Sequence, residues 1–184
     1  VEKDTLKYRF FGKLSFVSRK EWNKFMNEVA ELTGISILES KDNDSDIVVY
    51  FGRLNKYSKL VNANIPAQAY VNFNYWSNRR INRANEITAA SICIAPLKTP
   101  VLNEGVFRLK REFLKILGIV GEIDDQYSIF SKDGFTGYKN VSRKDKRFIK
   151  LHYQDAIQPG LSEYSLRGAI ETIPTIDEFA VEKL

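Results

Sequence analysis

The side chains that most often bind metals or act as nucleophiles are scarce in this chain of 184 residues. It contains one histidine, His152, and one cysteine, Cys93. Catalytic zinc sites take three protein ligands, mostly histidines, so a conventional histidine-ligated site cannot be assembled. His152 lies among apolar neighbours, and we expect a partly buried structural histidine. Cys93 lies in an apolar run and has no internal disulfide partner, so we expect a core thiol.

Carboxylates offer an alternative chemistry that needs no metal. Paired carboxylates act as general acid and base in glycosidases and related hydrolases. Glu112 together with Asp124 or Asp125 is the candidate set, although nothing in the spacing singles these residues out. No Gly-rich phosphate loop and no Ser-His-Asp set can be built from the sequence. A metal-independent hydrolase that uses Glu112 therefore remains an alternative function.

Aromatic and cationic side chains are interleaved from Tyr70 to Arg83, a stretch that includes Tyr75 and Trp76. Such platforms bind sugars, peptides or single-stranded nucleic acid. The simpler interpretation is a strand with alternating faces and a solvated turn. A basic run from Lys139 to Lys150 likewise suits either phosphates or the solvated start of a helix. The net charge of +5 and the pI near 9.2 favour anionic partners without requiring nucleic acid.

The composition is typical of one soluble globular domain, with 43% hydrophobic and 28% charged residues. The uncharged stretch from Ile87 to Leu97 is too short to span a bilayer, and we expect no transmembrane segment. The first residue is Val1 and not a methionine, which is compatible with a trimmed piece of a longer chain or with a mature form whose signal peptide has been removed.

Hydrophobic residues recur with a period near 3.6 in some segments and near 2 in others, which predicts helices and strands respectively. Most of the strands come first and most of the helices follow, which predicts an α+β fold. Spacing near 3.6 predicts helices, with Ser18 and Ser142 as N-caps and Gly34 and Gly118 as terminators. The predicted helices are 19–32, 101–117, 142–153 and 162–172, with a short helix or loop at 56–62. The predicted strands are 13–18, 35–39, 47–51, 70–75 and 87–94, and the first helix forms a crossover.

The helix predicted at 101–117 has two contrasting faces. Its core stripe consists of Val106, Leu109, Phe113, Ile116 and Leu117. Its polar face consists of Arg108, Arg111, Glu112 and Lys115. This second face is either the solvated side of an amphipathic helix or the lining of a cleft.

Three segments, taken together and in their order along the chain, indicate a family more specifically than any one of them alone. They are residues 109–119 (LKREFLKILGI), 127–133 (YSIFSKD) and 147–162 (RFIKLHYQDAIQPGLS). Together they resemble the bacterial family called domain of unknown function 2927, which is secreted or envelope-associated and is grouped with zincin-like peptidases. The resemblance covers roughly residues 13–170. It implies a twisted mixed sheet, an antiparallel edge strand that lines a cleft, and an active-site helix below that strand.

In active members of the wider metzincin group the helix carries H-E-x-x-H-x-x-G-x-x-H, whose histidines bind zinc. In this chain the helix histidines correspond to Arg111 and Lys115, the glutamate to Glu112, the glycine to Gly118 and the third ligand to Gly121. Phe130 stands at the methionine of the Met-turn. Arginine offers no lone pair, and a second cation one turn away also repels a divalent ion. We therefore expect no metal and no cofactor.

The resemblance implies a single zincin-like α+β domain at residues 1–172, with a sheet of about five strands at 13–97, a helical part at 100–172 and a tail at 173–184. From the resemblance we expect a non-catalytic pseudo-peptidase that is periplasmic, secreted or lipid-anchored outside the membrane. We expect it to bind a peptide, protein or envelope polymer in the former active-site cleft. Nucleic acid is a less favoured partner, and the sequence does not indicate an oligomeric state. The residues expected to bind the ligand are Tyr75, Trp76, Arg108, Arg111, Glu112 and Lys115.

Overall fold

The computed structural model describes residues 5–12, 17–42, 44–72, 75–84, 86–95, 102–158 and 161–173. Most of the strand predicted at 13–18 lies outside these residues, and so does the tail beyond residue 173. No helix among the described residues is long and apolar enough to cross a membrane.

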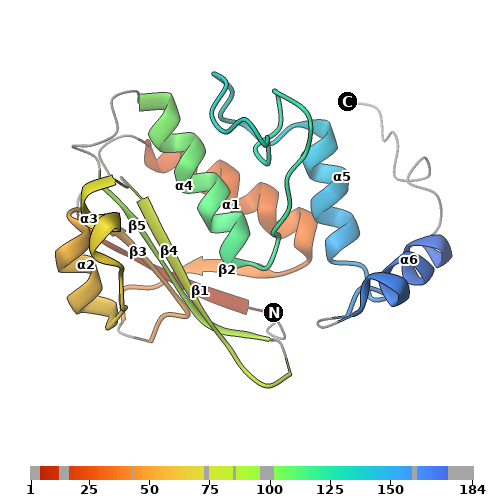
Figure 1. The fold of residues 1–184 in the computed structure, drawn as a ribbon, viewed down its shortest axis with the longest axis horizontal. Coiled ribbons are helices and arrows are strands. Elements are labelled where there is room, and N and C mark those ends of the chain that lie inside the picture. Colours follow the sequence, from red (N-terminus) through yellow and green to blue (C-terminus); the bar gives the residue numbers. More distant parts are fainter. Residues whose placement is uncertain are drawn as a thin grey trace.

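Among the described residues, five strands form one mixed sheet in the order β2-β1-β3-β5-β4 (Figure 1). The strands are β1 (Thr5–Phe11), β2 (Ser36–Glu39), β3 (Ile47–Phe51), β4 (Tyr75–Ile81) and β5 (Ile87–Ile94). Strands β2, β1, β3 and β5 run parallel, whereas β4 pairs antiparallel with β5 and forms an edge. The predicted mixed sheet of about five strands with an antiparallel edge strand is therefore confirmed.

The described residues contain six helices, most of which connect or cover these strands. They are α1 (Arg19–Thr33), α2 (Leu54–Val61), α3 (Ala67–Asn72), α4 (Leu102–Ile116), α5 (Arg143–His152) and α6 (Glu163–Thr172). Helix α1 connects the parallel strands β1 and β2, which confirms the predicted crossover. Ser18 caps α1 by accepting a hydrogen bond from the Glu21 amide at 3.1 Å, and Gly34 ends the helix with a φ of 72°.

The helices lie on both faces of the sheet. Helices α1 and α4 cover one face, and α2 and α3 cover part of the other (Figure 1). The larger core belongs to the α1 and α4 side, where the rings of Trp22 and Phe113 lie 5.4 Å apart edge to face. The five apolar residues predicted as the core stripe of α4 are all buried.

The prediction of a strand at 70–75 is wrong, because residues 67–72 form α3 and the strand begins at Tyr75. Alternation of aromatic and asparagine residues over this short window imitates the period of a strand. Ala69 is instead buried in the smaller core with Tyr57 and Ile65. A short helix after Pro66 brings Ala69 into that core, and tertiary packing decides the conformation.

The segment between α4 and α5 is held mainly by one buried carboxylate. Asp145 accepts hydrogen bonds from the amides of Ile129 at 2.9 Å and Ser142 at 2.7 Å, and also from the hydroxyl of Ser128. The same residue forms a capping box with Ser142, which confirms the predicted N-cap. The Met-turn-like segment is therefore fixed to the first turn of α5.

Candidate functional site

A cavity of about 440 Å³ lies between the edge strand β4 and helix α4. Its walls come from β4, from the C-terminal half of α4 and from the loop after α4. They are formed by Ser77, Asn78, Arg79, Arg111, Glu112, Lys115, Ile116, Val120, Gly121 and Glu122. The cavity thus contains four of the five positions that correspond to the zinc-binding motif.

Glu112 joins the strand to the helix. It is 4% exposed, and its Oε2 accepts a hydrogen bond from Ser77 Oγ at 2.5 Å. Its Oε1 accepts from Lys115 Nζ at 3.2 Å. Both carboxylate oxygens are therefore hydrogen-bonded within the protein, as a buried carboxylate requires.

Arg111 joins the same helix to the Met-turn-like segment. Its side chain is 11% exposed, Nη1 donates to the Ser131 carbonyl at 2.9 Å, and Nη2 lies 3.5 Å from Glu122 Oε1. Its buried Nε has no hydrogen-bond partner among the described residues. Arg111, at a position that corresponds to a metal ligand of the motif, thus connects the helix to the loop.

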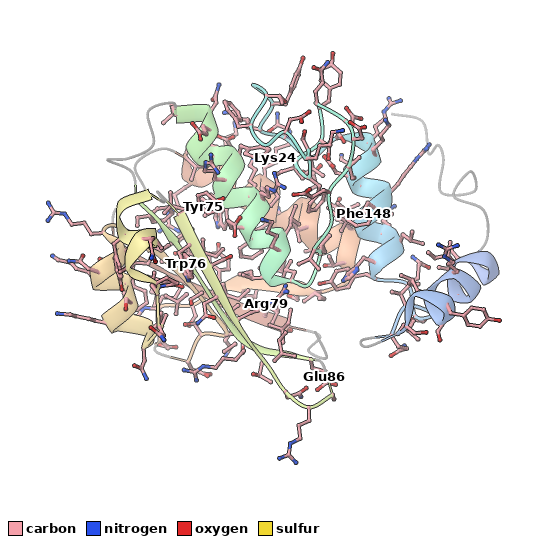
Figure 2. All side chains as sticks on the ribbon, viewed as in Figure 1. Lys24, Tyr75, Trp76, Arg79, Glu86 and Phe148 are labelled. Carbon is pink, nitrogen blue, oxygen red and sulfur yellow. The ribbon has the colours of Figure 1, made fainter. Side chains whose placement is uncertain are left out.

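Two cations remain at the C-terminal end of α4, where a helix dipole favours positive charge. The side chain of Lys115 is 33% exposed beside Glu112. Arg79 on β4 reaches across to donate from Nη1 to the Lys115 carbonyl at 3.0 Å (Figure 2). The cavity therefore combines solvent-accessible cations with a buried carboxylate.

These positions decide between the two interpretations of the polar face of α4. Arg111 and Glu112 do not form a solvated surface, because β4 and the loop after the helix close over them. Arg108 is only partly buried, pairs with Glu104 and lies 4.6 Å over the ring of Tyr75. The polar face thus lines a cleft, although Arg108 and Tyr75 are not among the residues that surround the cavity.

The other residues predicted at the site lie elsewhere. Trp76 packs against the smaller core on the opposite face of the sheet, so the structure does not bring it together with Lys115. Asp124 and Asp125 form ion pairs with Lys132 and Lys144, each at 3.0 Å. The Tyr127 amide and then the Lys144 ammonium lower the pKa of Asp125. Neither aspartate lines the cavity.

Two glycines follow α4 at positions that correspond to the motif: Gly118 to its glycine and Gly121 to its third ligand. Gly118 ends the helix in the left-handed region with a φ of 96°. A Cβ atom at Gly121, the position of the third ligand, would lie 2.9 Å from Cζ of Phe148. Because no side chain fits there without displacement of the ring, the space for a third ligand is occupied.

The residues at these positions do not fit a zinc ion. Arg111 has no lone pair, Lys115 is paired with Glu112, and Gly121 has no side chain. Within the described part of the chain, no group of three His, Cys, Asp or Glu side chains could hold a metal. Phe130, at the position of the Met-turn methionine, is fully buried, with its ring 5.5 Å from that of Phe148.

Neither His152 nor Cys93 lines the cavity. His152 is partly buried at the end of α5, and burial lowers its pKa. Cys93 is fully buried in the smaller core, where desolvation raises its pKa to about 12. The interpretation of Cys93 as a core thiol is confirmed.

Four polar residues of the cavity were not among the residues predicted at the site: Ser77, Asn78, Arg79 and Glu122. The first three lie on β4, and the strand predicted at 70–75 ended too early to include them. Glu122 lies in the loop after α4. The available signal was the pair of polar residues Ser77 and Arg79, which lie two positions apart and therefore both face α4.

Comparison with known proteins supports the architecture. The chain matches no protein-family model and no curated protein sequence. Among solved structures it is similar to that of myroilysin, a metallopeptidase, with a TM-score of 0.51 and 13% sequence identity. The similarity covers 83% of this chain and 85% of the other. The five-stranded, mostly parallel sheet and its helices therefore form a zincin-like fold.

Proposed function

We propose that this protein is a non-catalytic zincin-like domain that binds an extended peptide in the cleft between β4 and α4. The supporting observation is the state of the former metal positions. Arg111, Glu112 and Lys115 engage other protein groups there, while a cavity of about 440 Å³ remains open beside them. The cleft is thus retained without groups that fit zinc.

Strand addition is the binding mode that this edge favours. Among the described strands, β4 pairs with β5 alone, so its other side offers backbone donors and acceptors. An extended peptide beside β4 would have every second side chain directed towards the cavity. Backbone hydrogen bonds would supply affinity, and the cavity would supply selectivity.

The cations of the cavity favour an anionic group on the bound chain. Lys115 is partly exposed, and Arg79 uses one terminal nitrogen on a backbone carbonyl, which leaves it further donors. Arg111 is the weaker anchor for a ligand because Ser131 and Glu122 already hold it. A carboxylate of the peptide would then lie near Lys115.

Family and location belong to the same proposal. The three segments described above support membership of the domain of unknown function 2927, a family that functions in the bacterial envelope or outside the cell. On this basis the partner would be a peptide, protein or envelope polymer met outside the cytoplasm.

Peptide binding can be measured directly with a positional library of fluorescein-labelled, N-acetylated hexapeptides. Fluorescence anisotropy should detect binding of one or more sequences, with a Kd that rises at least tenfold when alternate amides of the peptide are N-methylated. Lys115→Ala should weaken the binding of peptides with a carboxylate, whereas Lys59→Ala, at an exposed position of α2, should leave it unchanged. Equal binding of methylated and unmethylated peptides would contradict strand addition, and absence of binding across the library would contradict the function.

A further inference from the structure

Cavities lie on both faces of the sheet beside the edge strand β4. The cavity already described lies on the α4 side. A second cavity of about 230 Å³ lies over the other face, beyond the end of α2. Asn78 and Arg79 border both cavities. A segment added to this edge would therefore have open space on each face of the sheet.

Consecutive arginines of β4 point to opposite faces. Arg79 and Arg80 pair with Ala90 and Ala89 of β5, and neighbouring side chains of a strand alternate. Arg79 faces α4, because it donates to the carbonyl of Lys115. Arg80 therefore faces the second cavity, which also contains Arg9 and Asp46.

The charged residues of β4 itself are all positive, although Glu112 and Glu122 line the cavity on one face of the sheet and Asp46 lines the cavity on the other. The strand carries no carboxylate, and the guanidinium of exposed Arg80 makes no hydrogen bond or ion pair with other described residues. Arg83, in the turn after β4, is exposed as well. Glu86, at the end of that turn, is bonded to Asn82 at 2.6 Å (Figure 2). Like charges disfavour pairing of this edge with a second copy of itself, and they favour an acidic strand.

We infer that the natural partner is a polypeptide segment with two consecutive acidic residues, one opposite Arg79 and the next opposite Arg80, an inference that rests on the proposed strand addition. Side chains directly opposite one another in a sheet have Cβ atoms about 4.5–5.5 Å apart, within reach of an arginine–carboxylate pair. The first acidic residue enters the α4-side cavity near Lys115. The second enters the cavity beside Arg80.

Four hexapeptides test this inference. Their central pair is Glu-Glu, Glu-Gln, Gln-Glu or Gln-Gln, and their flanking residues are identical threonines and valines. Anisotropy at low salt should give the tightest binding for Glu-Glu, with each replacement of Glu by Gln weakening binding about two- to fivefold. Arg80→Gln should remove the preference for Glu at one central position only. Arg79→Gln should remove it at the other, and Arg83→Gln should preserve both preferences.

The outcomes separate the inference from the function on which it rests. Equal binding of all four peptides would overturn the acidic pair and leave strand addition intact. Absence of binding by all four, and by the wider hexapeptide library, would overturn both. If N-methylation leaves the preference for Glu-Glu unchanged and a single-stranded oligonucleotide competes, the arginines form a general polyanion surface, which also overturns the inference.

Discussion

Ser77, on the strand side of the cavity, donates a hydrogen bond to the buried carboxylate of Glu112. Loss of its hydroxyl would leave Glu112 Oε2 buried without its donor, at a cost of about 1–3 kcal/mol. We therefore expect Ser77→Ala to lower the free energy of unfolding by that amount in urea titrations. Asn78→Ala, at the neighbouring exposed position, is the control and should change it by less than about 0.5 kcal/mol. An unchanged stability in Ser77→Ala would mean that Glu112 is solvated.

Gly121 is required because the ring of Phe148 fills the space that its side chain would need. Gly121→Ala should lower the free energy of unfolding by about 1–3 kcal/mol through overpacking. In a Phe148→Leu background the same substitution should cost less, because the ring is gone. Gly168→Ala is the control, since its Cβ would meet no atom within 4 Å. Equal costs of Gly121→Ala in the two backgrounds would show that the ring is not the obstacle.

Among the elements, α4 is tied to α1 through a buried lysine whose charge is costly. Lys110 lies 3.5 Å from Glu21 Oε1 and 3.2 Å from Asn140 Oδ1, and burial lowers its pKa below the ordinary value of 10.5. A base with a lowered pKa destabilises the fold below that pKa, and the penalty disappears as the pH rises towards 10.5. Glu21 keeps a second partner in Lys139, at 3.2 Å, if Lys110 is removed.

Lys110→Met should therefore stabilise the protein by about 1 kcal/mol or more at neutral pH. The difference between variant and wild type should shrink as the pH is raised to about 10, because the wild-type lysine then loses its proton. Urea unfolding at a series of pH values measures both quantities. The exposed Lys24→Met is the control and should show no such convergence. A difference that grows with pH would contradict a lowered pKa for Lys110.

The elements that could be predicted from the sequence are those with a long periodic pattern and a cap. Helices α1, α4, α5 and α6 and strands β2, β3 and β5 were placed within about two residues, and the short helix or loop predicted at 56–62 is α2. Apolar spacing, β-branched runs and Ser or Gly helix ends determine most of these elements locally. Strand β1 was not predicted, although Leu6 and Tyr8 alternate inwards, and α3 was predicted as a strand. Short segments take their conformation from the core they join, and that information is not local.

The candidate site was predictable where it lies on one helix and not where it depends on several elements. The spacing of Arg111, Glu112 and Lys115 fixes their common face, so their joint position at one cavity was expected. Burial of Glu112 was not foreseen, because it depends on Ser77 across the sheet edge. The distance of Trp76 from the cavity likewise follows from the register of β4, which the sequence does not determine.

At the level of the whole molecule, the connections across the cleft are made by side chains. The contacts of Arg111, Glu112 and Asp145 join sheet, helix and C-terminal part without groups that would require a metal. We therefore expect treatment with EDTA to change the Tm by less than about 1 °C, and elemental analysis of protein purified without added metal to find far less than one zinc per chain. One tightly held zinc per chain, or a large fall of the Tm with EDTA, would contradict the description of the site.

The close approach of Phe148 to Gly121 also limits the evolutionary routes open to this chain. A histidine at position 121 is disfavoured while the ring is present, and loss of the ring alone leaves a gap beside Phe130. Histidine at position 111 would abandon the contacts with Ser131 and Glu122 before any metal could compensate. Each single step towards a zinc site therefore lowers fitness for folding. Conversion of this cleft into a zinc site would therefore need coordinated substitutions at positions 111, 121 and 148.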